Sequence, residues 1–430
     1  MALLGFLTIA VLLFLIMTKK LSTILALILV PTVFALLGGA GAKVGTFIVN
    51  GIKNISPTGT MFIFAVLFFG ILTDAGMFDP VINGILKTVG RDPLKVTIAS
   101  AVLAMLVHLD GSGVVTFSIT VPAMLPLFEE LRMDKRVLAC VVALAAGTMN
   151  IVPWGGPTLR AATSLNLPIT TVYNPVLVPQ LAGLVCVLAI AYMLGMKERK
   201  RLGVTAQGGG VVERSLTESE KKLRRPHLFW FNVIVTVVAL VALIKAWQTP
   251  TVVFMIAFAI TLLVNYPNPK MQAERINAHA QAALLMASVL FAAGAFTGIM
   301  KDSKMLEAMT KFAVSAIPKG LGAHLPLIVG IFAMPLSLVF DPDSYYFGVL
   351  PVLASTVQGF GVEGVQVARA SILGQMTVGF PLSPLTPATL LLIGLCGIDL
   401  GDHQRFSFKW AWLTSLVALV VALILGVISV

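Results

Sequence analysis

Residues 150–157 read Asn-Ile-Val-Pro-Trp-Gly-Gly-Pro and interrupt an apolar stretch that is long enough to enter a lipid bilayer. A second interruption, Gly-Phe-Pro-Leu-Ser-Pro at residues 379–384, lies in a matching stretch of the second half. Unpaired backbone groups are not tolerated against lipid, so such breaks persist only where they line a cavity inside the protein. Paired breaks in two halves of one chain are the best sequence indication of a transporter's binding site.

The composition indicates a multi-pass membrane protein. Of the 430 residues, 58% are hydrophobic and only 11% are charged, whereas about a quarter are charged in a soluble domain. Basic loops that obey the positive-inside rule explain the net charge of +11 more simply than binding to nucleic acid, so we expect no nucleic-acid partner. The sequence contains no Walker A, HExxH or GxSxG motif, and we therefore expect a protein that is not an enzyme.

Two further interruptions lie in the long apolar stretches 95–128 and 325–357. They read Leu-Asp-Gly-Ser-Gly at 109–113 and Phe-Asp-Pro-Asp-Ser at 340–344. If each stretch is a re-entrant hairpin, most Lys and Arg residues fall on the side that carries the linker 197–227. The positive-inside rule then places this linker in the cytoplasm of a protein of the inner (plasma) membrane. We predict an all-α fold with about ten transmembrane helices and two re-entrant hairpins.

The two halves of the chain resemble each other weakly. Residues 69–73, Phe-Gly-Ile-Leu-Thr, resemble residues 293–297, Ala-Gly-Ala-Phe-Thr. Each half holds five crossing segments, and an odd number forces the second copy to be inverted. The predicted units are a first repeat 1–196, the linker 197–227 and a second repeat 228–430. The first repeat contains the hairpin 95–128 and the broken helix 137–167. The second contains the hairpin 325–357 and the broken helix 365–395.

The broken helices carry candidate groups for an anion. A helix that begins inside the membrane exposes N–H groups and a partial positive charge, and glycine lets a ligand approach the backbone. Arg160 adds a guanidinium that matches a carboxylate, or alternatively extends to the membrane interface. The alternative for the breaks themselves is that they are simple kinks. The substrate-binding candidates are Asn150, Gly155, Gly156, Thr158, Arg160, Ser383 and Thr386.

Acidic residues in the two interrupted stretches are candidates for binding a cation or a proton. Asp110 lies between two apolar runs, where an ionisable group is costly unless it is functional; alternatively it caps the following helix. Asp341 and Asp343 are spaced to share one hard cation, with Ser344 adding an oxygen. They equally fit the capping of a helix that starts at Ser344.

Four polar residues follow the last break: Asp399, Asp402, His403 and Arg405. We expect them in a solvated or gating cytoplasmic loop. The segment 399–402, Asp-Leu-Gly-Asp, superficially resembles an aspartyl-protease loop, but it lacks the glycine two positions before Gly401.

The string around the first break resembles the citrate–divalent-metal/proton symporter family, CitMHS. The resemblance rests on Leu-Asp-Gly-Ser-Gly at 109–113, Met-Asn-Ile-Val-Pro-Trp-Gly-Gly-Pro-Thr at 149–158 and Arg-Ala-Ala at 160–162. It extends to Phe-Asp-Pro at 78–80, Ser-Tyr-Tyr-Phe-Gly at 344–348 and Gly-Asp-His-Gln at 401–404. It implies a homodimer with a scaffold domain and an elevator-type transport domain, in which Ser112 and Gly113 occupy a substrate-binding hairpin tip.

The resemblance also implies the substrate. We expect proton-coupled uptake of citrate or a related small carboxylate as a complex with Mg²⁺ or Ca²⁺, and no permanently bound cofactor. Family members that carry metal–citrate often have a second acid and hydroxyl groups in the first tip, where this chain has Val114 and Val115. Free citrate is therefore one alternative. An inorganic-ion or cation/proton exchanger on the same fold is another, and it would need the acids but not Arg160.

Overall fold

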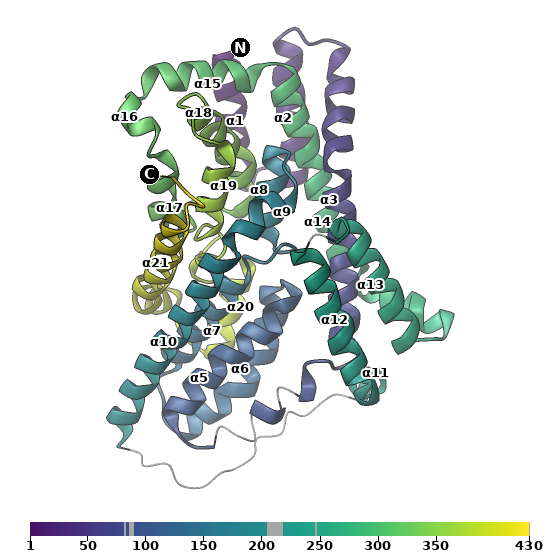
Figure 1. Cartoon of the computed structure of the whole chain (residues 1–430), viewed down its shortest axis with the longest axis vertical. Coiled ribbons are helices and arrows are strands. Elements are labelled where there is room, and N and C mark those ends of the chain that lie inside the picture. Colours follow the sequence, from purple (N-terminus) through teal and green to yellow (C-terminus); the bar gives the residue numbers. More distant parts are fainter. Residues whose placement is uncertain (81–82, 86–89, 204–217, 246, 430) are drawn as a thin grey trace.

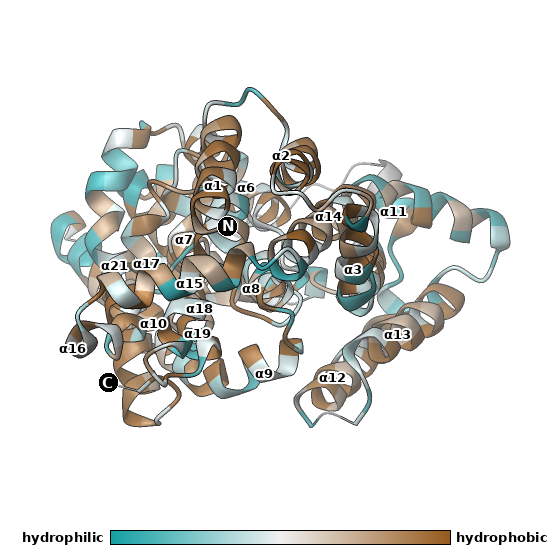
Figure 2. Cartoon of the chain, turned by 90° about the horizontal axis from the view of Figure 1, so that it is seen from above, coloured by the Kyte–Doolittle hydropathy of each residue, from teal (hydrophilic) through white to brown (hydrophobic). Residues whose placement is uncertain are grey.

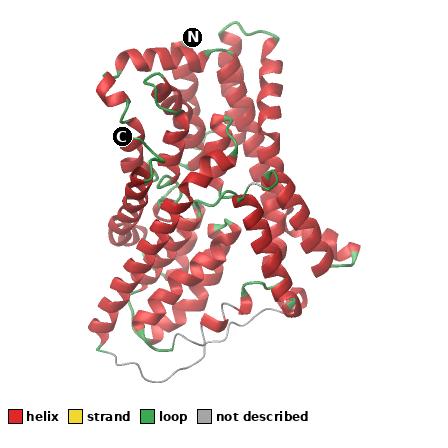
Figure 3. Cartoon of the chain, viewed as in Figure 1, coloured by secondary structure: helices red, strands yellow, loops and turns green. Residues whose placement is uncertain are grey.

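The computed structural model describes residues 1–80, 83–85, 90–203, 218–245 and 247–429, and every regular element in these ranges is helical (Figure 3). The predicted all-α class is confirmed. Residues 204–217 of the predicted linker lie outside the described ranges. The first half contains α1 (Ala2–Met17), α2 (Thr23–Leu37), α3 (Lys43–Asp74), α5 (Pro93–Val107), α6 (Gly113–Glu130), α7 (Lys135–Met149), α8 (Gly156–Leu165), α9 (Ile169–Tyr173) and α10 (Leu177–Leu202). The second half contains α11 (Glu218–Leu223), α12 (Phe229–Ile244), α13 (Pro250–Asn265), α14 (Pro269–Asp302), α15 (Met305–Ala316), α16 (Lys319–Gly322), α17 (Leu325–Leu336), the π-helical turn η4 (Ser344–Val349), α18 (Leu350–Gln358), α19 (Gly364–Ile372), α20 (Pro387–Cys396) and α21 (Leu400–Ile424).

The long helices α3 and α14 pack side by side along much of the molecule (Figure 1). Their contacts run in opposite order, because Gly51 meets Gly294 near one end and Gly70 meets His279 near the other. A Cβ atom on Gly51 would overlap the backbone carbonyl of Gly294. Small residues of this kind let two membrane helices approach closely and form a firm contact.

Both interrupted stretches reverse direction. In the first, α5 and α6 pack against each other, and an ion pair joins Arg91, just before α5, to Glu130, the last residue of α6. In the second, Gly322 before α17 packs on the ring of Phe360 after α18. The predicted interruptions at 109–113 and 340–344 are therefore the turns of two helical hairpins.

The predicted broken helices are α7–α8 and α19–α20, and their loops meet near the middle of the molecule (Figure 3). The first break needs glycine, because a Cβ on Gly155 would overlap the carbonyl oxygen of Asn150. Pro157 and Pro387 occupy the first turn of α8 and α20, where no N–H is required. In the second break Met376 adopts a left-handed backbone with φ of 51°, a strained conformation of the kind that gathers at functional sites.

Six helices in the described ranges are long and apolar enough to cross a membrane. Large apolar side chains also face outward, notably Trp230 and Ile234 on α12 and Ile256 and Leu263 on α13. These two helices stand at the edge of the molecule and are mostly hydrophobic (Figure 2). Such surfaces are stable against lipid, which fits a multi-pass membrane protein. The expected total of ten crossings stays a prediction.

Candidate functional site

The first hairpin turn is held by its own side chains and by the first break. Gly111 adopts a left-handed backbone with φ of 75°, which a residue with a Cβ rarely adopts. Ser112 caps α6 by accepting a hydrogen bond from Val115 N, and Asp110 Oδ1 accepts one from Ser112 N at 2.8 Å. Trp154 Nε1 donates to the carbonyl of Leu109 at 2.8 Å, which fixes the turn against the break.

The two breaks cross each other. Asn150 Nδ2 donates to the carbonyl oxygen of Met376 at 3.0 Å, across 226 positions of sequence. Gly147, one turn earlier on α7, lies so close to the second break that a Cβ there would stand 2.8 Å from Thr377 O and from Val378 Cα. The crossing therefore brings backbone against backbone, and any larger residue at 147 would separate the two segments.

The second hairpin turn is tied to the first broken helix by an ion pair. Arg160 Nε lies 2.7 Å from Asp343 Oδ1, and both side chains are largely buried. Asp341 instead caps the start of η4, because its carboxylate accepts hydrogen bonds from Asp343 N, Ser344 N and Ser344 Oγ. Arg160 thus points inward rather than to the interface, and Asp341 takes the capping role that the sequence left open.

These segments line a partly open cavity of about 480 Å³, called here the central cavity. The beginnings of three helices line it, through Gly113 of α6, Gly156 of α8 and Ala388 of α20. The first N–H groups of a helix have no acceptor within the helix, and they carry partial positive charge. Three such ends together with Arg160 make the cavity suited to a negatively charged guest.

The opposite wall of the central cavity belongs to α3 and α14. It is mostly apolar, with Phe62 and Phe69 as its large side chains, and Thr73 and His279 add polar groups at one end. His279 Nε2 lies 2.9 Å from Asp74 Oδ2, and Arg275 Nη1 lies 3.2 Å from the same oxygen. Sequence reasoning missed His279, because nothing in the sequence places the start of α14 beside the breaks.

The predicted site residues divide into two groups. Those that line the central cavity are Asp110, Ser112, Gly113, Asn150, Gly156, Arg160 and Thr386. The others stand just behind it and stabilise the breaks and turns. Thr158 Oγ1 donates to Ile151 O at 3.0 Å, and the buried Ser383 Oγ accepts from Leu385 N at 3.2 Å. Gly155, Ser344, Asp341 and Asp343 belong to this second group through the contacts described above.

No group of three or more His, Cys, Asp or Glu residues in the described ranges is arranged to hold a metal ion. Among the acidic residues that the structure describes, Asp110 lines the central cavity, whereas Asp343 does not line it and is paired with Arg160. A divalent cation at this place would therefore take most of its oxygen ligands from a carboxylate guest and from water, as Mg²⁺ commonly does.

The solvated or gating loop expected at 399–405 is wrong, because Asp402, His403 and Arg405 lie in the first turns of α21. Asp399 caps α21 by accepting from Gly401 N, so the helix already includes His403. His403 is fully buried, with Nε2 3.0 Å from Pro381 O. Gln404 Nε2 donates to Leu382 O at 2.9 Å. These side chains satisfy carbonyls that the second break leaves without helical partners, which explains why they are drawn inward.

Comparisons with known proteins show what the chain is similar to. A family model described as "Citrate transporter" matches residues 12–374. A Bacillus subtilis (strain 168) protein named "Citrate transporter" is 47% identical over 430 residues, which is the whole of both chains. Another from the same organism, "Mg(2+)/citrate complex secondary transporter", is 43% identical over 100% of this chain and 99% of its own. The solved YdaH transporter of Alcanivorax borkumensis shares the fold, with a TM-score of 0.59 at 13% identity over 89% of this chain and 87% of that chain.

Proposed function

The chain belongs to the citrate transporter family, CitMHS, and on that premise we propose that it imports citrate or a related carboxylate by secondary active transport. The substrate enters as a complex with Mg²⁺ or Ca²⁺, in symport with protons. The relatives are named as transporters, so no enzymatic step is involved.

One observation carries the proposal: three helix beginnings and Arg160 converge on the central cavity. Backbone N–H groups and a guanidinium are the donors that bind carboxylates. In this proposal Asn150, Gly156 and Arg160 bind the anion from the first half, and Thr386 binds it from the second half, with Ser112 and Gly113 at the hairpin turn. Thr158, Ser383, Ser344 and Gly155 keep these groups in place.

The charge of the substrate favours a cation partner. Moving a trianion into a cavity of low dielectric carries a desolvation penalty of many kcal/mol. Complexation with a divalent cation lowers the net charge that is moved. Asp110 lines the same cavity and is the titratable group that we assign to the proton or the metal.

The architecture gives these residues a route across the membrane. In our proposal the hairpins α5–α6 and α17–α18 are re-entrant and, with the broken helices, form a transport domain made of two inverted repeats. The helices α3 and α14 belong to the scaffold, whose mostly apolar wall lets the transport domain slide in an elevator-like movement. The protein is a homodimer in the inner (plasma) membrane, with the linker 197–227 in the cytoplasm.

Uptake by purified protein in proteoliposomes tests the proposal. With an inward proton gradient and Mg²⁺ or Ca²⁺ present, labelled citrate should accumulate inside the vesicles, and an uncoupler should abolish the accumulation. Failure to accumulate citrate with or without either metal would reject citrate as the substrate. Uptake of other labelled di- and tricarboxylates under the same gradient would then separate a wrong carboxylate from a wrong class of transporter.

A further inference from the structure

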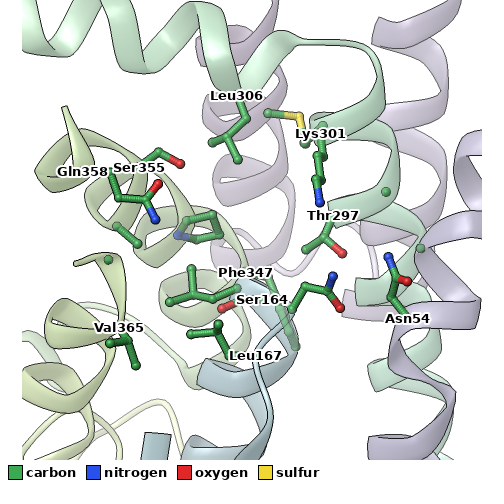
Figure 4. Close-up of a pocket in the computed structure, with 18 of the residues that line it drawn as sticks. Asn54, Ser164, Leu167, Thr297, Lys301, Leu306, Phe347, Ser355, Gln358 and Val365 are labelled. Carbon is green, nitrogen blue, oxygen red and sulfur yellow. The ribbon is translucent and has the colours of Figure 1, made fainter. Parts of the chain in front are cut away.

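A second and larger cavity, of about 800 Å³, shares no lining residue with the central cavity. We call it the outer cavity. One wall comes from the first half of α3 and the end of α14, and the other comes from the α8–α9 loop, η4 and the α18–α19 region (Figure 4). In Figure 4, Lys301, Thr297 and Asn54 occupy the first wall, and Ser355 and Gln358 face them.

The lining of the outer cavity carries charges of both signs. Lys301 is exposed into it and makes no ion pair within the described ranges. Asp302 and Glu363 contribute carboxylates, and Asn50 Nδ2 donates to Asp302 Oδ2 at 3.0 Å. A free carboxylate would meet two negative groups here. A carboxylate that already holds a divalent cation can bind in two ways at once. Its oxygen atoms face the ammonium group of Lys301, and the metal with its bound water faces the carboxylates of Asp302 and Glu363.

Residues of a single helix, α8, line both cavities. Gly156 and Arg160 line the central cavity, and Ser164 lines the outer cavity one helical turn later, about 6 Å along the axis. Asp343 and Phe347 of the second hairpin stand beside this turn, and Phe347 lines the outer cavity. The lining of the outer cavity therefore includes a residue only one turn of α8 beyond Arg160.

The internal repeat predicted from the sequence pairs a residue of one cavity with a residue of the other. It pairs residues 69–73 with 293–297, and Thr73 lines the central cavity while Thr297 lines the outer cavity. The same two helices therefore offer a mostly apolar wall to one cavity and a polar, charged wall to the other. An apolar wall suits sliding, whereas amide, hydroxyl and ammonium groups suit binding.

We propose that the outer cavity is a separate binding site for a metal–carboxylate complex, in which Lys301 pairs with a substrate carboxylate and Asp302 and Glu363 face the metal. The site holds the complex before it reaches Arg160. This inference rests on the proposed function, since it assigns the same class of substrate to a second place.

Equilibrium dialysis of the full-length purified protein with labelled citrate and Mg²⁺ tests the proposal. The wild-type chain should bind two citrates. Lys301→Gln should bind only one citrate. Its KM for uptake should rise about tenfold while kcat stays nearly unchanged. Lys301→Arg should restore the second bound citrate and the wild-type KM. Lys53→Gln is the matched control, because it removes the same charge from an exposed lysine in the first half of α3, which packs beside α14, without lining the cavity, and it should still bind two citrates.

The outcomes separate this inference from the proposed function. Arg160→Ala should abolish uptake and still bind one citrate, in the outer cavity. If the wild type takes up citrate but binds only one, and Lys301→Gln has an unchanged stoichiometry and KM, the outer site is rejected while the transport function stands. If the wild type neither binds nor transports citrate, both fail together. If Lys301→Gln does not fold, Glu363→Gln and Asp302→Asn replace it as test variants. In these two variants, binding of the second citrate should depend less strongly on Mg²⁺ than it does in the wild type.

Discussion

Arg160 Nε lies 2.7 Å from Asp343 Oδ1, although 183 positions of sequence separate the two residues. The side chains are only 8% and 14% exposed, so neither charge is well solvated. The pair joins the first broken helix to the turn of the second hairpin. A carboxylate that reaches Arg160 therefore shares the guanidinium with Asp343, and this shared partner links the central cavity to the second hairpin.

The first prediction distinguishes two roles of this ion pair, which are stabilisation of the fold and binding of the substrate. Arg160→Gln leaves Asp343 buried without a counter-charge, which should cost about 3 kcal/mol of stability, and Asp343→Asn should cost a similar amount by stranding Arg160. The double variant removes both charges and should recover the thermal unfolding midpoint of the wild type in detergent. It should still fail to take up citrate, because the guanidinium is missing. A double variant with wild-type uptake would show that the pair has only a structural role.

The second prediction concerns Asp110. Its Oδ1 accepts a hydrogen bond from Ser112 N, and Asp110→Asn keeps this acceptor while it removes the titratable charge. The fold should survive, and uptake should lose its dependence on the proton gradient or on Mg²⁺. The matched control is Asp399→Asn, which makes the same change at a helix cap that does not line the cavity. Unchanged pH and metal dependence in Asp110→Asn would exclude the coupling role.

The third prediction tests the crossing of the two breaks. A Cβ at Gly147 would stand 2.8 Å from Thr377 O and Val378 Cα, both of which are backbone atoms that cannot rotate away. Gly147→Ala should therefore destabilise the protein by about 2 kcal/mol and lower uptake. Gly45→Ala, in the first turn of α3, meets nothing within 4 Å and should be neutral or slightly stabilising. Equal unfolding midpoints for the two variants would contradict the close crossing.

The sequence predicts the breaks because their causes are local. Pro157 and Pro387 begin helices, Gly155 admits no Cβ, and Asp-Gly-Ser-Gly at 110–113 combines a left-handed glycine with a serine cap. Each of these effects acts within a few residues and can be read from residue type alone. The boundaries of the predicted broken helices, 137–167 and 365–395, accordingly fall within two residues of the observed ends at 135, 165, 364 and 396.

Partners across the fold could not be predicted in the same way. The bond from Asn150 to Met376 O and the ion pair of Arg160 with Asp343 depend on how two distant segments meet. For His403 the sequence led to a wrong prediction. Its polar neighbours favoured a solvated loop, whereas in the structure the carbonyl of Pro381 needs a buried hydrogen-bond donor, which His403 provides. An unsatisfied backbone group attracts a polar side chain into the interior, and no pattern in the sequence shows which residue will meet it.

The last prediction uses Asn150, which lines the central cavity and donates to Met376 O. Asn150→Ala loses the donor and should cost about 1–3 kcal/mol, because the carbonyl of Met376 stays buried without it. Asn150→Asp loses the same donor and also adds a negative charge to a cavity proposed to hold an anion. Both variants should unfold at lower temperature than the wild type, but citrate with Mg²⁺ should raise the unfolding midpoint of Asn150→Ala far more than that of Asn150→Asp. The control Asn277→Asp adds the same charge at an exposed position of α14 and should respond to citrate as the wild type does. If Asn150→Asp is stabilised by citrate as strongly as Asn150→Ala, the anion does not bind beside this residue, and the place assigned to the substrate is wrong.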